Sequence, residues 1–220
     1  MPSSEPPPAG IHHLTPGNGD DGLVRTLVER PRRAGEAGVE LTLMVLSVSN
    51  LGLAALDLAS GAVVRTGIDR LDRVALRPYD VVSTRLAARA EPIDPTQPEA
   101  VSLADTPRPL RRLTPRRAER WLRPILHPEW AHLLGFAGPS IPFWELDGTR
   151  PSVAVVPARA AMGIDDDGLL RCRFLWRTLV HDLPVALSRN ARLPSEAARV
   201  VVALTSPVEG HCYKVVTGIL

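Results

Sequence analysis

Short apolar runs separated by turn residues dominate the pattern of hydrophobic and polar positions beyond residue 39. Residues 40–48 and 51–58 form two such runs, and a Ser-Gly pair leads from the second into a third at 62–66. Runs of this length that are closed by glycine-containing turns are typical of β-hairpins. Further runs predict strands at 79–88, 99–104, 152–158, 169–180, 198–204 and 211–220. Because short strands follow one another, the pattern favours small barrels or a sandwich over a βαβ fold.

The strand predicted at 169–180 has the most regular alternation. Cys172, Phe174 and Trp176 fall on one side of it, whereas Arg171 and Arg173 fall on the other. Successive side chains of a strand point to opposite faces of the sheet. One face of this strand should therefore be buried and the other charged.

Helical spacing is confined to the middle of the chain. Thr114 and Pro115 form a helix start, with threonine as the N-cap and proline at the first helical position. Apolar residues then recur at helical spacing as far as Ile125, and a second short helix is predicted from Pro128 to Gly135. The helical segment therefore separates two β regions.

Residues 1–38 differ from the rest of the chain in composition. Proline and glycine recur through them, and only a short apolar stretch at 23–28 interrupts the pattern. Such a segment cannot bury enough apolar surface to offset the entropy lost on ordering, so we expect a disordered tail. The predicted organisation is a tail at 1–38, a first β domain at 39–112, a helical connector at 113–137 and a second β domain at 138–220.

The overall composition is that of an ordinary globular protein. Hydrophobic residues make up 45% of the chain and charged residues 23%, and the net charge of +2 is too small to imply a polyanionic partner for the whole molecule. Two cysteines are too few for a disulfide framework, and the sequence shows neither a signal peptide nor an apolar run of membrane-spanning length. We therefore expect a cytoplasmic protein with free thiols that does not contact a membrane.

Motifs for catalysis or metal binding are weak throughout the sequence. The glycine pattern at 17–22 matches a dinucleotide fingerprint only literally, because it lies in the tail rather than between a strand and a helix. The cysteines and histidines lack the short fixed spacings of a zinc site, and no Gly-x-Ser-x-Gly sequence occurs. The sequence therefore predicts no catalytic residue, no metal and no cofactor.

Positive charge is concentrated between Thr106 and Arg123. Seven arginines stand there against one glutamate, which gives the segment a net charge of +6 in a chain whose total is +2. On the predicted helix, Arg116, Arg120 and Arg123 share one face, a geometry that can follow a phosphate backbone. The plainer alternative is a solvated helix face.

We place a candidate nucleic-acid interface on this basic segment, assisted by the charged face of the strand at 169–180 and by Trp176. Aromatic residues make up only 4% of the chain, and we expect most of them, Phe143, Trp144 and Tyr213 included, to lie in the core. The candidate interface residues are Arg111, Arg112, Arg116, Arg117, Arg120, Arg123, Arg171, Arg173 and Trp176.

Four further stretches occur in a characteristic order, namely 77–82 (RPYDVV), 94–99 (DPTQPE), 171–176 (RCRFLW) and 211–216 (HCYKVV). In order and spacing they resemble a prokaryotic family with two OB folds, the dual OB-containing domain family. The resemblance covers about 39–220. It implies a mainly β protein with two small OB-like barrels joined by a short helical insertion. It also implies a nucleic-acid or nucleotide ligand and a role in bacterial defence, without catalytic residues.

Together these observations predict a non-enzymatic binding module whose arginine-rich surface meets nucleic acid or a nucleotide. The alternative is a protein-protein interaction module, an adaptor, in which the same surface meets an acidic protein partner.

Overall fold

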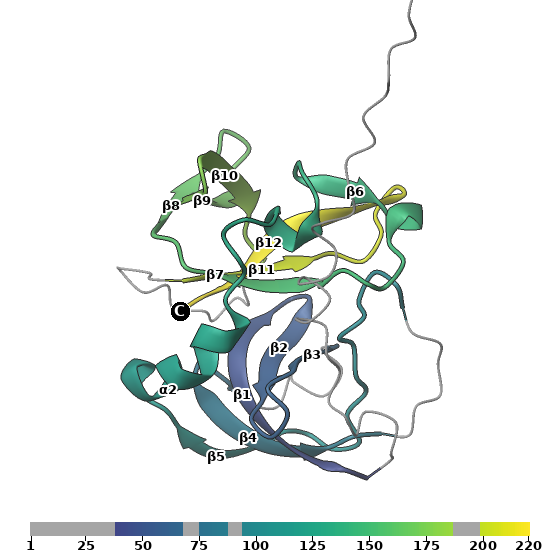
Figure 1. Ribbon diagram of the computed structural model, residues 1–220, viewed down its shortest axis with the longest axis vertical. Helices are drawn as coiled ribbons and strands as arrows, with labels where there is room; N and C mark the ends of the chain where they lie inside the picture. The colour runs from purple at the N-terminus through teal and green to yellow at the C-terminus, as the bar shows by residue number, and fades with distance from the viewer. Residues whose placement is uncertain (1–37, 68–74, 88–93, 187–198) are drawn as a thin grey trace, which may run out of the picture.

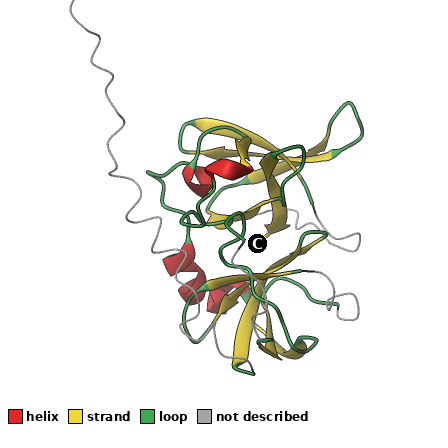
Figure 2. Ribbon diagram, turned by 90° about the vertical axis from the view of Figure 1, so that its right-hand side faces the viewer, coloured by secondary structure: helices red, strands yellow, loops and turns green. Residues whose placement is uncertain are grey.

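Strands account for most of the regular structure in the computed structural model, which describes residues 38–67, 75–87, 94–186 and 199–220 (Figure 1). The described strands form three antiparallel sheets, and the described helices are few and short (Figure 2). The mainly β class is therefore confirmed. The predicted tail at 1–38 lies outside the described residues except for Gly38.

The first sheet has five strands in the order β3-β2-β1-β4-β5. They are β1 (Glu40–Ser49), β2 (Gly52–Asp57), β3 (Val63–Thr66), β4 (Asp80–Arg85) and β5 (Arg108–Arg112). The pairing of β1 with β2 shifts between Val45 and Ser47, and bulges of this kind bend a strand and increase its twist. The sheet curls into a half-barrel (Figure 1).

Both faces of β1 are buried, which explains why its sequence is almost continuously apolar rather than alternating. Met44 and Leu46 pack in a cluster with Ala118 and Leu122 of the helix. Leu43 and Val45 belong to a second cluster on the other face of the sheet. The continuous apolar run thus predicted a strand correctly, because the strand lies between two layers of core.

The helix predicted at Thr114 is confirmed as α2 (Pro115–Leu122), and a 3-10 turn, η2 (Arg123–Ile125), continues it. The Thr114 hydroxyl accepts a hydrogen bond from the Arg117 N–H at 3.3 Å. Ala118 and Leu122 are fully buried, so they fix the opposite, arginine-bearing face toward the surface.

The second predicted helix, from Pro128 to Gly135, is wrong over most of its length. Only η3 (Leu133–Gly135) is helical, as a 3-10 turn. The His127 Nε2 accepts a hydrogen bond from the Leu134 N–H at 3.0 Å, and Leu134 adopts a φ of 57°. This side-chain bond turns the chain back on itself where a helix would have continued.

Two sheets make up the second β region. One is ordered β10-β9-β8 and contains β8 (Ala160–Ile164), β9 (Leu170–Trp176) and β10 (Leu179–Pro184). The other is ordered β6-β12-β11-β7 and contains β6 (Ser140–Pro142), β7 (Val153–Val156), β11 (Val200–Leu204) and β12 (His211–Ile219). A bridge between Val185 and Val216 connects the two sheets along one edge.

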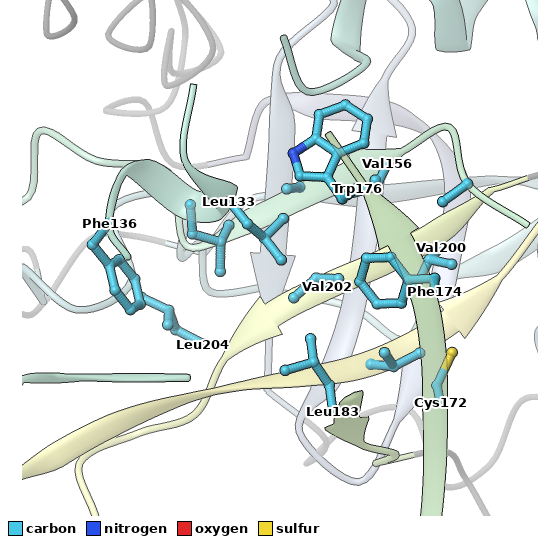
Figure 3. Close-up of a cluster of buried hydrophobic side chains, with 14 of the residues drawn as sticks. Leu133, Phe136, Val156, Cys172, Phe174, Trp176, Leu183, Val200, Val202 and Leu204 are labelled. Carbon is cyan, nitrogen blue, oxygen red and sulfur yellow. The ribbon is translucent and has the colours of Figure 1, made fainter. Parts of the chain in front are cut away.

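The core between these sheets contains the apolar side of β9. Cys172, Phe174 and Trp176 belong to one core cluster with residues of the facing sheet, and Phe174 lies beside Val200 and Val202 (Figure 3). The predicted alternation of this strand is therefore confirmed. Its predicted length is wrong, because Arg177 adopts a φ of 57° and the chain turns there into β10.

Residues 99–104 do not form the predicted strand. They contribute only two isolated bridges, Arg65 with Ala100 and Leu86 with Leu103. The ladder to β4 is instead made by β5, where all five residues are exposed. An exposed edge strand with a proline carries no apolar alternation, so nothing in its sequence marked it as a strand.

The two β regions contact each other closely between β1 and β12. Gly218 lies against β1, where a Cβ atom would come within 2.5 Å of the Ser47 Cβ. Beside it, the buried hydroxyls of Ser47 and Thr217 lie 3.1 Å apart. Val153 and Val201 also share a core cluster with Met44. The regions thus share a core, and the predicted domain boundaries remain predictions.

Candidate nucleic-acid interface

Five arginines from β5 and α2 line a single pocket of about 430 Å³, which we call the arginine pocket. Leu113 completes its wall. The arginines are Arg111, Arg112, Arg116, Arg117 and Arg120. The structure therefore brings five of the nine predicted interface residues to one concave surface.

A tight connection between strand and helix creates this pocket. Arg112 pairs with Asp80 in the ladder of β4 and β5, and the Leu113 N–H donates to the Tyr79 carbonyl at 2.9 Å. Thr114 then caps α2 directly, so only two residues separate the strand from the helix. Arginines at the end of the strand and in the first turns of the helix consequently face the same space.

The charges in the pocket are largely uncompensated. Arg112 Nε lies 3.2 Å from the Asp80 carboxylate, and the Arg120 guanidinium lies 5.0 Å from the ring centre of Trp121. Arg111, Arg116 and Arg117 form no ion pair with any residue that the structure describes. No carboxylate is among the lining residues. The pocket is therefore a site of positive potential.

Arg123 is not part of the pocket lining, although it was predicted to share a helix face with Arg116 and Arg120. Its Nε lies 3.6 Å from a Glu119 carboxylate oxygen, and the other oxygen of Glu119 accepts a hydrogen bond from Arg199. Arg123 follows α2 in η2, past the turns that face β5. Its charge is partly compensated by its neighbour.

Arg171 and Arg173 lie on β9, at the opposite end of the molecule from α2 and β5 (Figure 1). Both form ion pairs with Asp182 of β10, with nitrogen–oxygen distances of 2.8 and 3.0 Å. Hydrogen bonds from these two guanidinium groups lower the pKa of the Asp182 carboxyl. The charged face of β9 is therefore present as predicted, but its arginines share a carboxylate.

Trp176 cannot offer its ring to a base in this structure. It is only 3% exposed and packs in the core between the sheets, where its edge meets the His127 ring at 5.9 Å (Figure 3). We therefore leave it out of the interface.

An exposed aromatic surface lies elsewhere, and the sequence analysis missed it. Phe143 and Trp144 of the 3-10 helix η4 (Phe143–Glu145) and Tyr213 of β12 are exposed, Trp144 by 66%. The Trp144 ring lies 5.4 Å from Phe143 and 6.1 Å from His211. Gly210 makes room for it, since a Cβ there would lie 3.3 Å from the indole. The expectation that these three aromatics are core residues is wrong.

The buried ionisable groups have structural partners and do not line the arginine pocket. The Lys214 ammonium donates to the Phe136 and Gly138 carbonyls, each at 2.7 Å, and burial lowers its pKa to about 8. Glu99 accepts hydrogen bonds from the Ser152 N–H and hydroxyl at 2.7 and 2.6 Å, while desolvation raises its pKa. Burial raises the pKa of the Cys172 thiol to about 11.

The described residues contain no group of three or more His, Cys, Asp or Glu side chains placed to hold a metal ion. Within the same residues, no helix has the length and apolar character needed to cross a membrane. No protein-family model, curated protein or solved structure matches the chain. The family resemblance and the absence of enzymatic activity thus remain predictions.

Proposed function

We propose that this protein is a non-enzymatic module that binds the phosphates of a nucleic acid or nucleotide in the arginine pocket. The observation that carries the proposal is the convergence of five arginines from two elements on one pocket of about 430 Å³. A merely solvated helix face would spread its arginines outward instead of lining a concavity with a neighbouring strand.

The chemistry of arginine favours phosphate as the ligand. A guanidinium group presents several N–H donors in a planar fork that matches phosphate oxygens, and it stays charged at any physiological pH. Arg111, Arg116 and Arg117 have no carboxylate partner among the described residues, so their donors are free for a ligand. The pocket also has the size of a small-ligand site, which is roughly 300–1,000 Å³.

The fold is consistent with this use. We propose that each β region is an OB-like barrel, supported for the first by its curled five-stranded sheet and for both by the family resemblance. OB folds are partly open five-stranded barrels that recur in oligonucleotide-binding proteins. We further propose that the protein acts in the cytoplasm, as its low cysteine content favours, and within a bacterial defence system, as the family resemblance implies.

The salt dependence of oligonucleotide binding tests the proposal. Fluorescence anisotropy with single- and double-stranded oligonucleotides should show affinity that falls steeply between about 50 and 200 mM salt, since each neutralised phosphate contributes a slope of about −0.7 to −0.9. Competition by a nucleoside triphosphate would show whether single phosphate chains suffice. Undetectable binding at low salt, or binding without a salt slope, would refute the proposal.

A second candidate is a protein-interaction module. The exposed aromatic surface around Trp144 favours it, because contiguous exposed apolar rings mark interaction sites. The arginine pocket also fits an acidic protein partner electrostatically. An acidic peptide that competes as strongly as an oligonucleotide of equal charge would favour this alternative.

A further inference from the structure

β8 is an edge strand of the second sheet. It pairs with β9 on one side, and no other described strand pairs with it on the other. The edge carries none of the usual protection within Ala160–Ile164, which contains neither a charge nor a proline. Unprotected edges offer a row of unpaired backbone groups to another strand.

The hydrogen-bond pattern identifies which backbone groups face outward. The Asp165 N–H donates to the Leu169 carbonyl at 2.9 Å, so this opposed pair is a hydrogen-bonded one. In an antiparallel ladder such pairs alternate with non-bonded ones, and therefore Ala161 and Gly163 bond to β9. Ala160, Met162 and Ile164 consequently direct their N–H and carbonyl groups away from β9, toward the open edge.

The same sheet carries exposed apolar side chains. Five large apolar residues in and beside its strands are more than half exposed. These residues are Ile164, Leu169, Leu175, Leu179 and Val180. Of these, Ile164 lies on β8 itself, where an exposed apolar side chain favours contact with another protein.

We propose that β8 pairs with β8 of a second copy of this chain, antiparallel and about a two-fold axis at Met162. The pairing joins two three-stranded sheets into one continuous sheet. Closed two-fold dimers are the commonest homo-oligomers, and their interfaces must be self-complementary. The sequence of β8 and its flanks meets this requirement in shape and in charge.

Shape complementarity follows from the register. With Met162 opposite itself, the large and 75% exposed Ile164 lies opposite the small Ala160 of the second copy. On the other face, Ala161 lies opposite Gly163, so no bulky side chains oppose each other there. The three residues whose backbone groups face the open edge all fall at hydrogen-bonded positions of the new ladder.

Charge complementarity follows from the residues that flank the strand. Arg159 is exposed and, in this register, lies opposite Asp165 of the second copy. The Asp165 carboxylate also lies 3.8 Å from Arg171 of its own chain. Because Asp165 begins an acidic turn with Asp166 and Asp167, Arg159 nevertheless meets a surface with a net negative charge. The two-fold axis creates this contact twice. A second copy of the chain therefore matches this strand edge in shape and charge better than an unrelated strand would.

This inference does not depend on the proposed function. The arginine pocket is lined by residues of α2 and β5 and of the segment between them, and these two elements lie at the opposite end of the molecule from β8 (Figure 1). Loss of dimerisation and loss of phosphate binding would be seen in separate assays.

The test combines oligomeric state with site-specific cross-linking. Sedimentation velocity should show a concentration-dependent dimer for the natural chain and a monomer for Ile164→Lys, which places a charge at the new ladder. Met162→Pro should give the same result, because it removes an outward N–H without breaking the ladder to β9. Leu110→Lys, at an exposed position of β5, is the matched control and should remain a dimer.

Cross-linking tests the register itself. Under mild oxidation, Met162→Cys in a Cys172→Ala background, which removes the thiol opposite position 162 on β9, should form a disulfide-linked dimer. Opposed residues of a hydrogen-bonded pair have Cα atoms about 5.5 Å apart. Ala161→Cys should not, because Ala161 faces Gly163 of the second copy, and the natural thiols are buried. A natural chain that stays monomeric, or a dimer that Ile164→Lys leaves intact, would overturn the proposal. If Met162→Pro fails to fold, the oligomeric state of Ile164→Lys, at an exposed position, decides whether the proposal holds.

Discussion

Two groups of arginines on this protein look alike in sequence and differ in their surroundings. Arg116 and Arg117 of α2 line the arginine pocket without a carboxylate partner among the described residues. Arg171 and Arg173 of β9 share the carboxylate of Asp182 across a hairpin. Both groups are on the surface, yet only the first retains positive charge that a ligand could neutralise.

The difference shows that the number of arginines is a poor measure of a binding surface. An ion pair at the surface stabilises the fold only slightly, but it occupies the donors that a phosphate would need. Each group has two arginines, and three of the four are exposed. The partner across the strand decides which surface can bind an anion.

Removing the same number of arginines from each group gives the largest expected effect. Arg116→Gln with Arg117→Gln should weaken oligonucleotide binding about 10- to 100-fold at low salt and reduce the salt slope by about one per lost phosphate contact. Arg171→Gln with Arg173→Gln removes equal charge and should change the affinity less than about two-fold. Fluorescence anisotropy across a salt series measures both variants.

Misfolding of the variants is not expected to affect this comparison of oligonucleotide affinities. The side chains of Arg116 and Arg117 are exposed, and Thr114 accepts its hydrogen bond from the Arg117 backbone, which glutamine retains. Thermal unfolding of both double variants provides the check. Equal loss of affinity in the two variants would mean that total charge, rather than the pocket, governs binding.

The sequence predicted the regions where local pattern and tertiary structure agree. The apolar run of β1, the hairpin that follows and the start of α2 at Thr114 all depend on neighbouring residues. β5 was not predicted because it is an exposed edge strand, with a proline and no buried face. The turn at Arg177 was missed because neither glycine nor proline marks it, although Arg177 adopts a φ of 57°.

The candidate site was predictable only in part, for the same reason. A charge count along the chain found the basic segment that contains the pocket. Whether Arg173 is paired depends on Asp182, whose position follows from the β9–β10 turn that the sequence did not show. Trp144 was missed because large rings are usually buried, whereas here Gly210 leaves space for an exposed one. In both cases the role of the side chain depends on residues that are distant in sequence, and the residue type alone does not show it.

Lys214 shows a second way in which this fold removes positive charge from the surface, namely burial. Its folded pKa of about 8 lies below the ordinary 10.5, so the unfolded chain holds more protons between these values. Stability should therefore rise as the pH increases through 8, by at most about 1.4 kcal/mol per pH unit. Urea unfolding from pH 7 to 8.5 measures this rise below the ordinary thiol pKa of 9, near which the raised pKa of Cys172 begins to oppose it.

Lys214→Met keeps the aliphatic stem but has no charge to titrate, so it serves as the matched variant. It should be less stable overall, because the Phe136 and Gly138 carbonyls lose their donor. Its stability should nevertheless lack the rise between pH 7 and 8.5. A rise that persists in the variant would assign the effect to another group.

The smallest expected effect comes from releasing the paired arginines instead of removing the free ones. Asp182 keeps its charge through the physiological range, since Arg171 and Arg173 lower its pKa, so a substitution is needed to neutralise it. In the background of Arg116→Gln and Arg117→Gln, Asp182→Asn should restore weak oligonucleotide binding, by about two- to five-fold, with a renewed salt slope. The gain should come chiefly from Arg173, because Arg171 still lies 3.8 Å from the Asp165 carboxylate. Anisotropy at low salt measures the gain. If binding does not recover, free positive charge alone is not sufficient, and the concave shape of the arginine pocket is also required for binding. The positive charge released on β9 would then lack a surface shaped to hold phosphate.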